Sequence, residues 1–439
     1  MEANNFFEKH FKLTERKTSV KTEIMAGLTT FMTMSYILAV NPDLLSQAGM
    51  DKGGVFTASI ISSIIAMLVM GFLANLPFGM GPGMGLNAFF TYTVVLGMGY
   101  SWQYALTAVF LEGIVFLILS LFGVREAIFK AIPLTLKKAV SAGIGLFIAL
   151  VGLSSAGIVT PGDGTVLQLS SLATRESLVF IVGLLVIAIL LAKDVKGSLL
   201  YGILVATGLS LLLGVSHYQG GSPITLPPSI KNVAFKLDFK NIFTADMFAV
   251  MFTFLFVDIF DTVGTLVGVS DKAGLLDEKG DLEAAGPALL ADAIGTTAGA
   301  LLGTSTVTTF VESASGVADG GRTGLTSIST AFFFFLSLFL FPIFSMIPSQ
   351  ATAPALVIVG LMMMSSVVDI NFDDFTDSIP AFLTIIMMPY AYSIAEGISF
   401  GMISYVILKF LSGKRKEISP LMYILALIFL LRKLQPLFG

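Results

Sequence analysis

The sequence contains no cysteine, only two histidines, one tryptophan and 12% charged residues in a chain of 439. Without cysteine the chain cannot form disulfides, thiolate metal sites or thiol nucleophiles. His10 and His217 both lie outside the long apolar stretches, which argues against a histidine-ligated haem or metal within a membrane. The chain also lacks an HExxH pair and a histidine at membrane depth that could act as a base. An intramembrane enzyme is therefore disfavoured, and we expect no catalytic residue, cofactor or metal site.

Apolar residues are abundant, at 55% of the chain. With so few charges, a chain of this composition could not remain soluble as a globular domain, and a bilayer span needs about 20 apolar residues. Residues 1–21 are polar and basic with no apolar h-region, so they do not form a cleavable signal peptide. The run Leu421 to Leu431 is too short to span comfortably and is predicted to be an interfacial helix. The predicted fold is an all-α polytopic membrane protein with about fourteen spans, at residues 23–41, 54–74, 79–97, 103–123, 136–153, 177–192, 197–214, 246–270, 286–302, 304–317, 323–344, 352–367, 378–394 and 397–411.

The distribution of lysine and arginine predicts the orientation of these spans. If the N-terminus is cytoplasmic, 20 of the 25 basic residues fall in cytoplasmic segments, as the positive-inside rule requires. The loop 215–245 would then be extracellular, and both termini would lie in the cytoplasm. We accordingly predict a plasma (inner) membrane location. The five basic residues on the opposite side are Lys52, Arg175, Lys231, Lys236 and Lys240.

The stretch GTSTVTTFVESASGV, from Gly303 to Val317, does not resemble a membrane helix. Six of the eight residues from Thr304 to Val311 are β-branched, which favours a strand. In hydrocarbon, a strand leaves backbone groups without helical partners, so it is tolerated only beside other protein or a water-filled cavity. The carboxylate of Glu312 follows, and Ser313 to Gly316 could begin a half-helix whose N-terminus faces the membrane interior. This stretch is therefore a predicted substrate site.

A second interrupted span, PFGMGPGMGLNAFF, runs from Pro77 to Phe90. Four glycines and one proline between Gly79 and Gly85 are incompatible with a helix interior. Asn87 follows the break and can both donate to and accept from a polar ligand. A glycine-rich helix crossing or a tight turn is the alternative interpretation.

The two halves of the chain also resemble each other. Ala131-Ile132-Pro133 before one span recurs as Met346-Ile347-Pro348 before another, and the two interrupted spans occupy corresponding places. Seven spans per unit is an odd number, so the halves must cross the membrane in opposite directions. The sequence therefore predicts a 7+7 inverted repeat, as found in secondary transporters.

Acidic residues at membrane depth are costly and are therefore candidates for function. Asp258 and Asp261 lie at i and i+3 of one helix, and Glu312 follows the strand-like break. A buried carboxyl group of this kind could bind a coupling proton and hydrogen-bond a heterocycle. Each also has a structural interpretation: the aspartates could bond neighbouring helices, and Glu312 could cap its own half-helix. Glu112 and Asp292 are predicted to be structural.

The motifs GMGLNAFF, VDIFDTVGT and GTSTVTTFVESASGV, in this order, resemble the AzgA-like adenine, guanine and hypoxanthine permeases of the nucleobase/ascorbate transporter superfamily. The resemblance covers nearly the whole chain. It implies a core domain of spans 1–4 and 8–11 that moves against a gate domain of spans 5–7 and 12–14. It also implies short strands in the broken spans 3 and 10 that meet at mid-membrane. The implied segments are 1–22 (cytoplasmic), 23–123 (core), 124–214 (gate), 215–245 (extracellular loop), 246–344 (core), 345–411 (gate) and 412–439 (cytoplasmic, with the interfacial helix).

The resemblance also implies which residues hold the ligand. Related uracil transporters carry a glutamate at the position of Asp261 and a histidine at that of Thr265, so a histidine proton relay cannot be transferred to this chain. The implied proton-coupling groups are Glu312, Asp258 and Asp261, and which aspartate touches the ligand stays open. The implied substrate-binding residues are Glu312, Asp261, Asp258, Asn87, Ser313 and Thr308.

The function predicted from these observations is proton-coupled import of purine nucleobases (hypoxanthine, guanine, adenine) by alternating access. The coupling ion, H⁺ or Na⁺, and the preferred purine stay open. The expected partners are the purine and membrane lipid, with no nucleic acid and a possible homodimer. The alternative is a transporter of the same fold for another small solute, such as an anion or a pyrimidine; acidic residues at the candidate site argue against an anion. Paired interruptions in an inverted repeat disfavour a channel.

Overall fold

The computed structural model describes residues 2–121, 133–162, 164–217, 221–240, 242–276, 282 and 284–438, and these are mainly helical. Ten helices in this part of the chain are long and apolar enough to cross a membrane. This confirms a polytopic helical membrane protein, while the count of fourteen spans stays a prediction. Three of the 20 basic residues counted as cytoplasmic, Arg125, Lys130 and Lys279, lie outside the described residues, as do Ala131 and Ile132 of the repeat.

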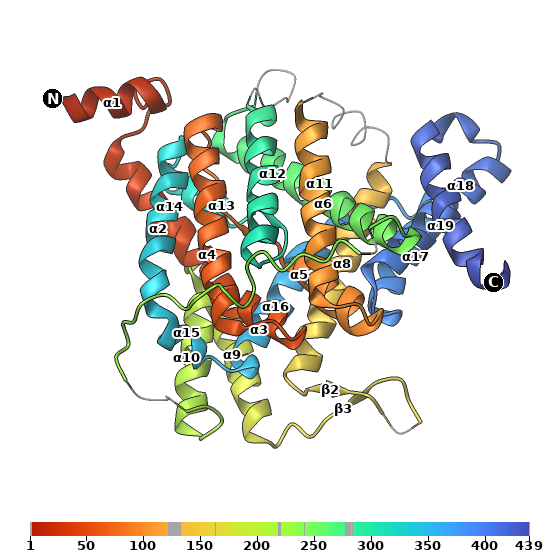
Figure 1. Cartoon of the computed structure of the whole chain (residues 1–439), viewed down its shortest axis with the longest axis horizontal. Helices are drawn as coiled ribbons and strands as arrows, with labels where there is room; N and C mark the ends of the chain where they lie inside the picture. Colours follow the sequence, from red (N-terminus) through yellow and green to blue (C-terminus); the bar gives the residue numbers. More distant parts are fainter. Residues whose placement is uncertain are drawn as a thin grey trace.

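The first half of the chain begins with a short helix and continues as membrane helices, two of which are interrupted (Figure 1). The span predicted at 23–41 falls within one candidate membrane crossing, Val20–Gln47, which is divided at Ser35 and Tyr36 into two helices. Pro42 lies inside α3, where it offers no N–H to the carbonyl of Leu38. The elements are α1 (Glu2–Phe11), α2 (Val20–Met34), α3 (Ile37–Gln47), α4 (Lys52–Val69), η1 (Met70–Ala74), β1 (Met80–Pro82), α5 (Met84–Ala88), η2 (Phe89–Gly97), α6 (Trp102–Leu121), α8 (Leu134–Ser155), β2 (Val159–Thr160), β3 (Gln168–Leu169), α9 (Arg175–Ala192) and α10 (Ser198–Leu212).

The second half follows a similar order, with one strand inside an interrupted span. Its last helix begins at Pro420 as predicted from the apolar run, but it extends beyond Leu431 to Phe438. The elements are α11 (Ala245–Ala273), α12 (Ala285–Leu302), β4 (Val307–Thr309), α13 (Ser313–Ala318), α14 (Gly324–Ser337), η3 (Leu338–Leu340), α15 (Phe341–Ser345), α16 (Ser349–Met364), η4 (Ser365–Asp369), α17 (Phe375–Tyr390), α18 (Ile394–Leu411), η5 (Arg415–Glu417) and α19 (Pro420–Phe438).

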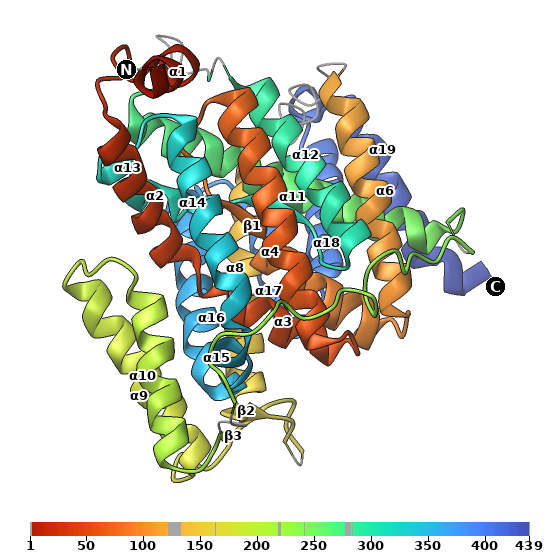
Figure 2. The same ribbon diagram turned by 60° about the vertical axis from the view of Figure 1, so that its left-hand side comes forward.

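The helices pack as two groups. The larger group contains α2 to α6 and α11 to α14 with the strands β1 and β4, and the smaller group contains α8 to α10 and α16 to α18. Figure 2 shows α9 and α10 of the smaller group standing at one side of the molecule. Contacts between the two halves of the chain occur in equivalent pairs. α2 packs on α14, and its counterpart in the second half, α11, packs on α6. Likewise α8 packs on α17, and its counterpart α16 packs on α9. This matching is the packing expected of two halves related by an inverted repeat.

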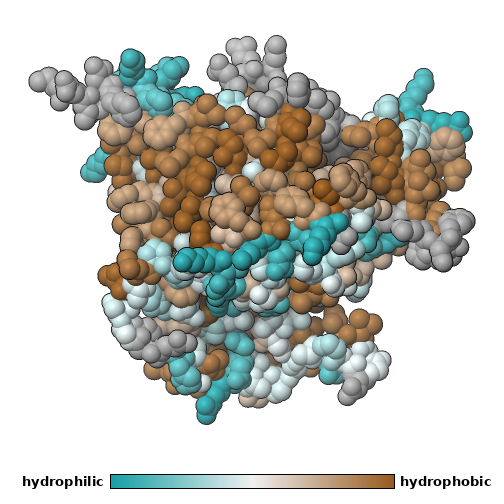
Figure 3. All heavy atoms as spheres, viewed as in Figure 1, coloured by the Kyte–Doolittle hydropathy of each residue, from teal (hydrophilic) through white to brown (hydrophobic). Residues whose placement is uncertain are grey.

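The surface fits insertion into a bilayer. A wide band of hydrophobic side chains covers much of the face shown in Figure 3, with hydrophilic side chains above and below it. At one end of the smaller group, charged residues tie the start of α17 to the end of α18. Lys409 donates to Asp377 over 2.9 Å and to Glu417 over 2.6 Å. A hydrogen bond from Lys414 holds the pKa of Asp374 well below its usual range, and Asp374 caps α17.

Candidate functional site: a carboxylate-lined cavity beside two crossed strands

The two interrupted spans meet through their strands, as predicted. β1 and β4 pair antiparallel, with Met80 opposite Thr309 and Pro82 opposite Val307. Outside the pairing, Gly83 N–H donates to Thr306 O over 3.0 Å, and Phe310 N–H donates to Gly79 O over 3.0 Å. The backbone of this non-helical segment is therefore satisfied by other protein, which is the condition for its stability inside a membrane.

Threonine side chains complete the same junction. The Thr296 hydroxyl donates to Val307 O over 3.0 Å and accepts from Val307 N–H over 3.2 Å. The hydroxyls of Thr262 and Thr308 lie 2.6 Å apart, so the middle of β4 is joined to α11. The β-branched residues that favour an extended backbone thus also provide its hydrogen bonds to neighbouring helices.

A cavity of about 760 Å³ lies beside this junction, between the two helix groups. Such a volume is within the range of about 300–1,000 Å³ typical of small-molecule sites. One wall comes from α2, α5, α11 and α13 of the larger group, and the other from α8, α16 and the connection between α9 and α10. A smaller hollow of about 60 Å³ adjoins it next to β4. The main cavity reaches exposed residues at Asp194 and Lys196.

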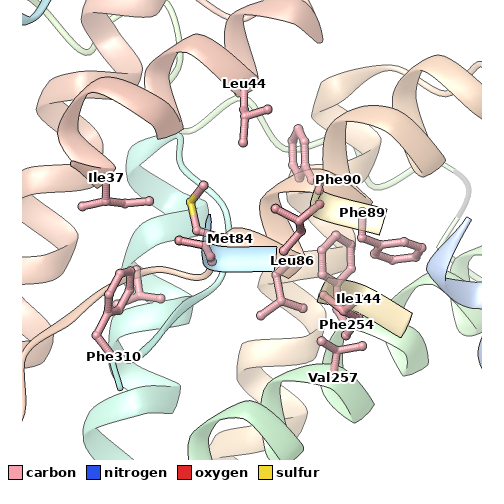
Figure 4. Close-up of a cluster of buried hydrophobic side chains, with 14 of the residues drawn as sticks. Ile37, Leu44, Met84, Leu86, Phe89, Phe90, Ile144, Phe254, Val257 and Phe310 are labelled. Carbon is pink, nitrogen blue, oxygen red and sulfur yellow. The ribbon is translucent and has the colours of Figure 1, made fainter. Parts of the chain in front are cut away.

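An apolar cluster lies where the cavity meets α5 (Figure 4). Leu86, Ile144 and Val257 gather on one side of Met84, with Ile37 and Phe310 on the other. Ile144 and Val257 line the main cavity, and Met84 and Phe310 line the smaller hollow. A planar apolar ring would therefore find van der Waals contacts here, close to the polar groups described next.

Glu312 lines the cavity from the start of α13. It occupies the N-cap position, but its side chain makes no capping hydrogen bond. The first amides of α13 are already satisfied: Ser313 N–H donates to Phe310 O over 3.1 Å, and Ala314 N–H donates to Val311 O over 3.0 Å. The carboxylate instead accepts a hydrogen bond from the Tyr36 hydroxyl, at 2.9 Å from Oε1. Glu312 is thus not used as a helix cap and remains accessible to a ligand.

The structure places Asp261 and Asp258 in different surroundings. Asp261 lines the same cavity as Glu312, together with Thr265 of its own helix. Asp258 is fully buried inside the larger group, where it shares a hydrogen bond with Glu112. Asp292 is buried beside the same pair. The cavity therefore contains Asp261 and Glu312, and Asp258 belongs to a separate buried carboxyl cluster.

The remaining predicted site residues take part mainly in the junction. The Ser305 hydroxyl donates to Asn87 Oδ1, and Asn87 is buried away from the cavity lining. Ser313 Oγ accepts from Gly79 N–H over 2.9 Å. Thr308 lines the smaller hollow next to Glu312. These three residues hold the two interrupted spans together.

Sequence reasoning did not find Tyr36, Thr33 or the residues that the smaller group contributes to the cavity, such as Ser141 and Met363. A tyrosine, a threonine or a serine in an apolar helix gives no signal of its own, since such residues are common there. In the described part of the chain, no group of three or more His, Asp or Glu side chains is arranged to hold a metal ion.

Two interrupted spans, one from each half of the chain, pair beside a polar cavity between two groups of helices. This is the architecture of transporters built from an inverted repeat. The chain belongs to the Permease family, because the family model Xan_ur_permease matches residues 21–400. It is a permease and not an enzyme.

Individual relatives extend this result over nearly the full chain. Adenine permease AdeP of Escherichia coli is 42% identical over 97% of this chain and 95% of its own length. Guanine/hypoxanthine permease PbuG of Bacillus subtilis is 45% identical over 96% of this chain and 98% of its own length.

Solved structures share the fold at low sequence identity. The transmembrane domain of the cyanobacterium bicarbonate transporter BicA matches with a TM-score of 0.63 at 16% identity, covering 86% of this chain and 97% of that one. Murine Slc26a9, an anion transporter in an inward-facing state, matches with a TM-score of 0.63 at 12% identity, over 89% of this chain and 68% of that one.

Proposed function

We propose that this permease imports purine nucleobases across the plasma membrane together with protons. Its relatives named as adenine and guanine/hypoxanthine permeases align over nearly the whole chain, at 42% and 45% identity. The observation that carries the proposal is the pair of carboxyl groups, Asp261 and Glu312, that line one cavity from α11 and from the start of α13.

The chemistry of a purine suits this pair. A carboxylate accepts hydrogen bonds only, whereas its protonated form also donates one. Purine bases present ring N–H groups, exocyclic amines and ring nitrogen acceptors, so two carboxyl groups can bond both kinds of edge. A proton taken up by Asp261 or Glu312 would change the hydrogen bonds available to the base. This supports coupling between proton binding and purine binding. An inorganic anion would instead meet two acidic side chains.

Alternating access would move the larger group against the smaller one. On the side of Asp194 and Lys196 the cavity reaches exposed residues, and positive-inside counting places these in the cytoplasm. On the other side, Tyr92 of the larger group meets Tyr392 of the smaller group, with ring centroids 5.8 Å apart. Phe147 of the smaller group packs on the same Tyr392 ring at 5.3 Å. This arrangement supports an inward-facing state for the structure.

Uptake into proteoliposomes tests the proposal. We expect saturable uptake of labelled hypoxanthine, guanine or adenine that rises with an inwardly directed proton gradient and is blocked by a protonophore. Uracil and bicarbonate serve as competitors for the alternative substrates. Glu312→Gln should weaken purine binding strongly, since it removes a charged acceptor. Uptake that ignores an imposed pH gradient would refute the proton coupling, and the absence of purine uptake would refute the substrate.

A further inference from the structure

Tyr36 is buried at the break between α2 and α3, where it contacts the site through its hydroxyl. The residue is 1% exposed. Its hydroxyl donates to Glu312 Oε1 over 2.9 Å, and its side chain lines the smaller hollow together with Asp261 and Thr308. Tyr36 therefore borders the hollow beside the proposed ligand site and also bonds the Glu312 carboxylate that lines this site.

The Tyr36 hydroxyl is the only side-chain donor that reaches the Glu312 carboxylate within the described residues. Helix capping does not hold this carboxylate, because the amides of Ser313, Ala314 and Ser315 bond to backbone carbonyls. Apart from a hydrogen bond with the backbone of Glu312 itself, the orientation of this side chain consequently depends on the phenolic hydrogen bond from Tyr36.

The backbones on either side of this bond are closely packed. α13 packs directly on α2, so that a Cβ on Gly316 would come within 2.6 Å of Ala26 O. The Thr33 hydroxyl, one turn before Tyr36, lies 3.4 Å from the carbonyl oxygen of Glu312. The tyrosine and the glutamate are thus brought together by the packing of two helices, and only their side-chain torsions remain adjustable.

We propose that Tyr36 is a positioning residue that fixes the direction of the Glu312 carboxylate and so determines which N–H of the ligand it bonds. This inference rests on the proposed binding of a purine. With Oε1 held by the phenol, Oε2 presents its lone pairs in a fixed direction, and a ligand N–H must approach along it. Without the phenol, the carboxylate can turn and accept from a different N–H of the same base.

Binding to the full-length protein in detergent, measured by calorimetry, tests this role. The ligands are hypoxanthine and its 1-methyl, 7-methyl and 9-methyl derivatives, each of which blocks a different nitrogen. We expect the wild type to reject one isomer most strongly, which identifies the N–H bonded by Glu312. Tyr36→Phe should bind hypoxanthine about tenfold more weakly, and its discrimination against that isomer should shrink by a similar factor.

Tyr92→Phe is the matched control, because Tyr92 is a buried tyrosine of the larger group whose hydroxyl donates to Gln47 over 2.8 Å, away from the cavity lining. It should bind all four ligands as the wild type does. In a Glu312→Gln background, Tyr36→Phe should have little further effect, since the tyrosine acts through the glutamate.

The results that would overturn the inference are distinct from a failure of the proposed function. If the wild type binds purines but Tyr36→Phe leaves all four affinities unchanged, or lowers all four equally, Tyr36 does not position Glu312. If the wild type binds none of the four ligands, this inference fails, and the purine function fails with it if adenine and guanine are not bound either. A melting temperature of Tyr36→Phe equal to that of Tyr92→Phe establishes that the variant is folded.

Discussion

Asp258 and Asp261 are three residues apart on α11, yet their side chains lie in different surroundings. Each residue of an α-helix turns by about 100°, so residues three apart differ in direction by about 60°. An aspartate side chain is too short to compensate for that difference. Asp261 consequently lines the cavity with Glu312, while Asp258 bonds Glu112 inside the larger group.

Neutral substitutions should separate the two roles. Asp261→Asn should weaken hypoxanthine binding by about tenfold or more, because a charged acceptor at the ligand is lost. Asp258→Asn, the matched control, should change the affinity by less than about threefold, since Asp258 lies off the cavity. Calorimetric titration of both variants measures this difference. Equal losses of affinity would show that Asp258 also reaches the ligand.

Among single residues, the sequence predicted the carboxylates that are energetically unfavourable inside a membrane, and it missed the polar residues that carry no such cost. A carboxylate at membrane depth carries a large desolvation cost, so Asp261 and Glu312 could be singled out without a structure. Tyr36 has no such cost, and its role arises from a contact between residues 276 positions apart in the chain. Asn87 was singled out for its polarity, but its partner Ser305 comes from the other half of the chain. Contacts of this kind cannot be read from local composition.

The interrupted spans are the elements that the sequence predicted best. Gly and Pro around Gly81, and β-branched residues around Thr308, oppose helix locally, and the structure forms β1 and β4 there. The break between α2 and α3 was missed because its residues, Ser35 and Tyr36, are compatible with a helix. The hairpin of β2 and β3 was also missed, since two-residue strands leave almost no periodic pattern.

The close approach of the two strands makes a prediction about Gly83. A Cβ at this position would lie 2.7 Å from Thr308 Cγ2, so Gly83→Ala should destabilise the junction by about 1–3 kcal/mol. Thr308→Ser removes that methyl group and keeps the hydroxyl that meets Thr262, so the double variant should recover much of the loss. Thermal unfolding in detergent measures the effect.

Gly208→Ala in α10 is the control, because a Cβ there meets nothing within 4 Å. Its unfolding temperature should match that of the wild type. If Gly83→Ala unfolds at the same temperature as Gly208→Ala, the strands are not tightly packed at this point.

At the scale of the whole molecule, the two helix groups contact each other at several places, such as α5 with α8 and α10 with α2. Another contact is the ion pair between Lys196, in the connection between α9 and α10, and Asp319 at the end of α13. Asp319 also accepts from the Thr29 hydroxyl over 2.6 Å. The pair lies beside the opening of the cavity and is formed while the cavity is open there, so it stabilises this state relative to one in which the two residues are apart.

Removing this pair should therefore change how long the cavity stays open on that side. Partly exposed ion pairs contribute about 0.2–1 kcal/mol, so Lys196→Ala should shift the population of this state by up to about fivefold. The chain has no cysteine, so a single cysteine at Ser141, on the cavity wall, can report accessibility through its alkylation rate. We expect slower alkylation in Lys196→Ala than in the control Lys193→Ala. An unchanged rate would show that the pair does not bias the state.

The pairing of β1 with β4 also imposes an order on the synthesis of the protein. Met80 pairs with Thr309, and since ribosomes add roughly 5–20 residues per second, β1 waits on the order of ten to fifty seconds for its partner. During that interval its backbone groups must be satisfied by water, by a provisional contact or by an insertion factor. Newly made chains of this permease are therefore most vulnerable to quality control after the first half has entered the membrane and before the second half arrives.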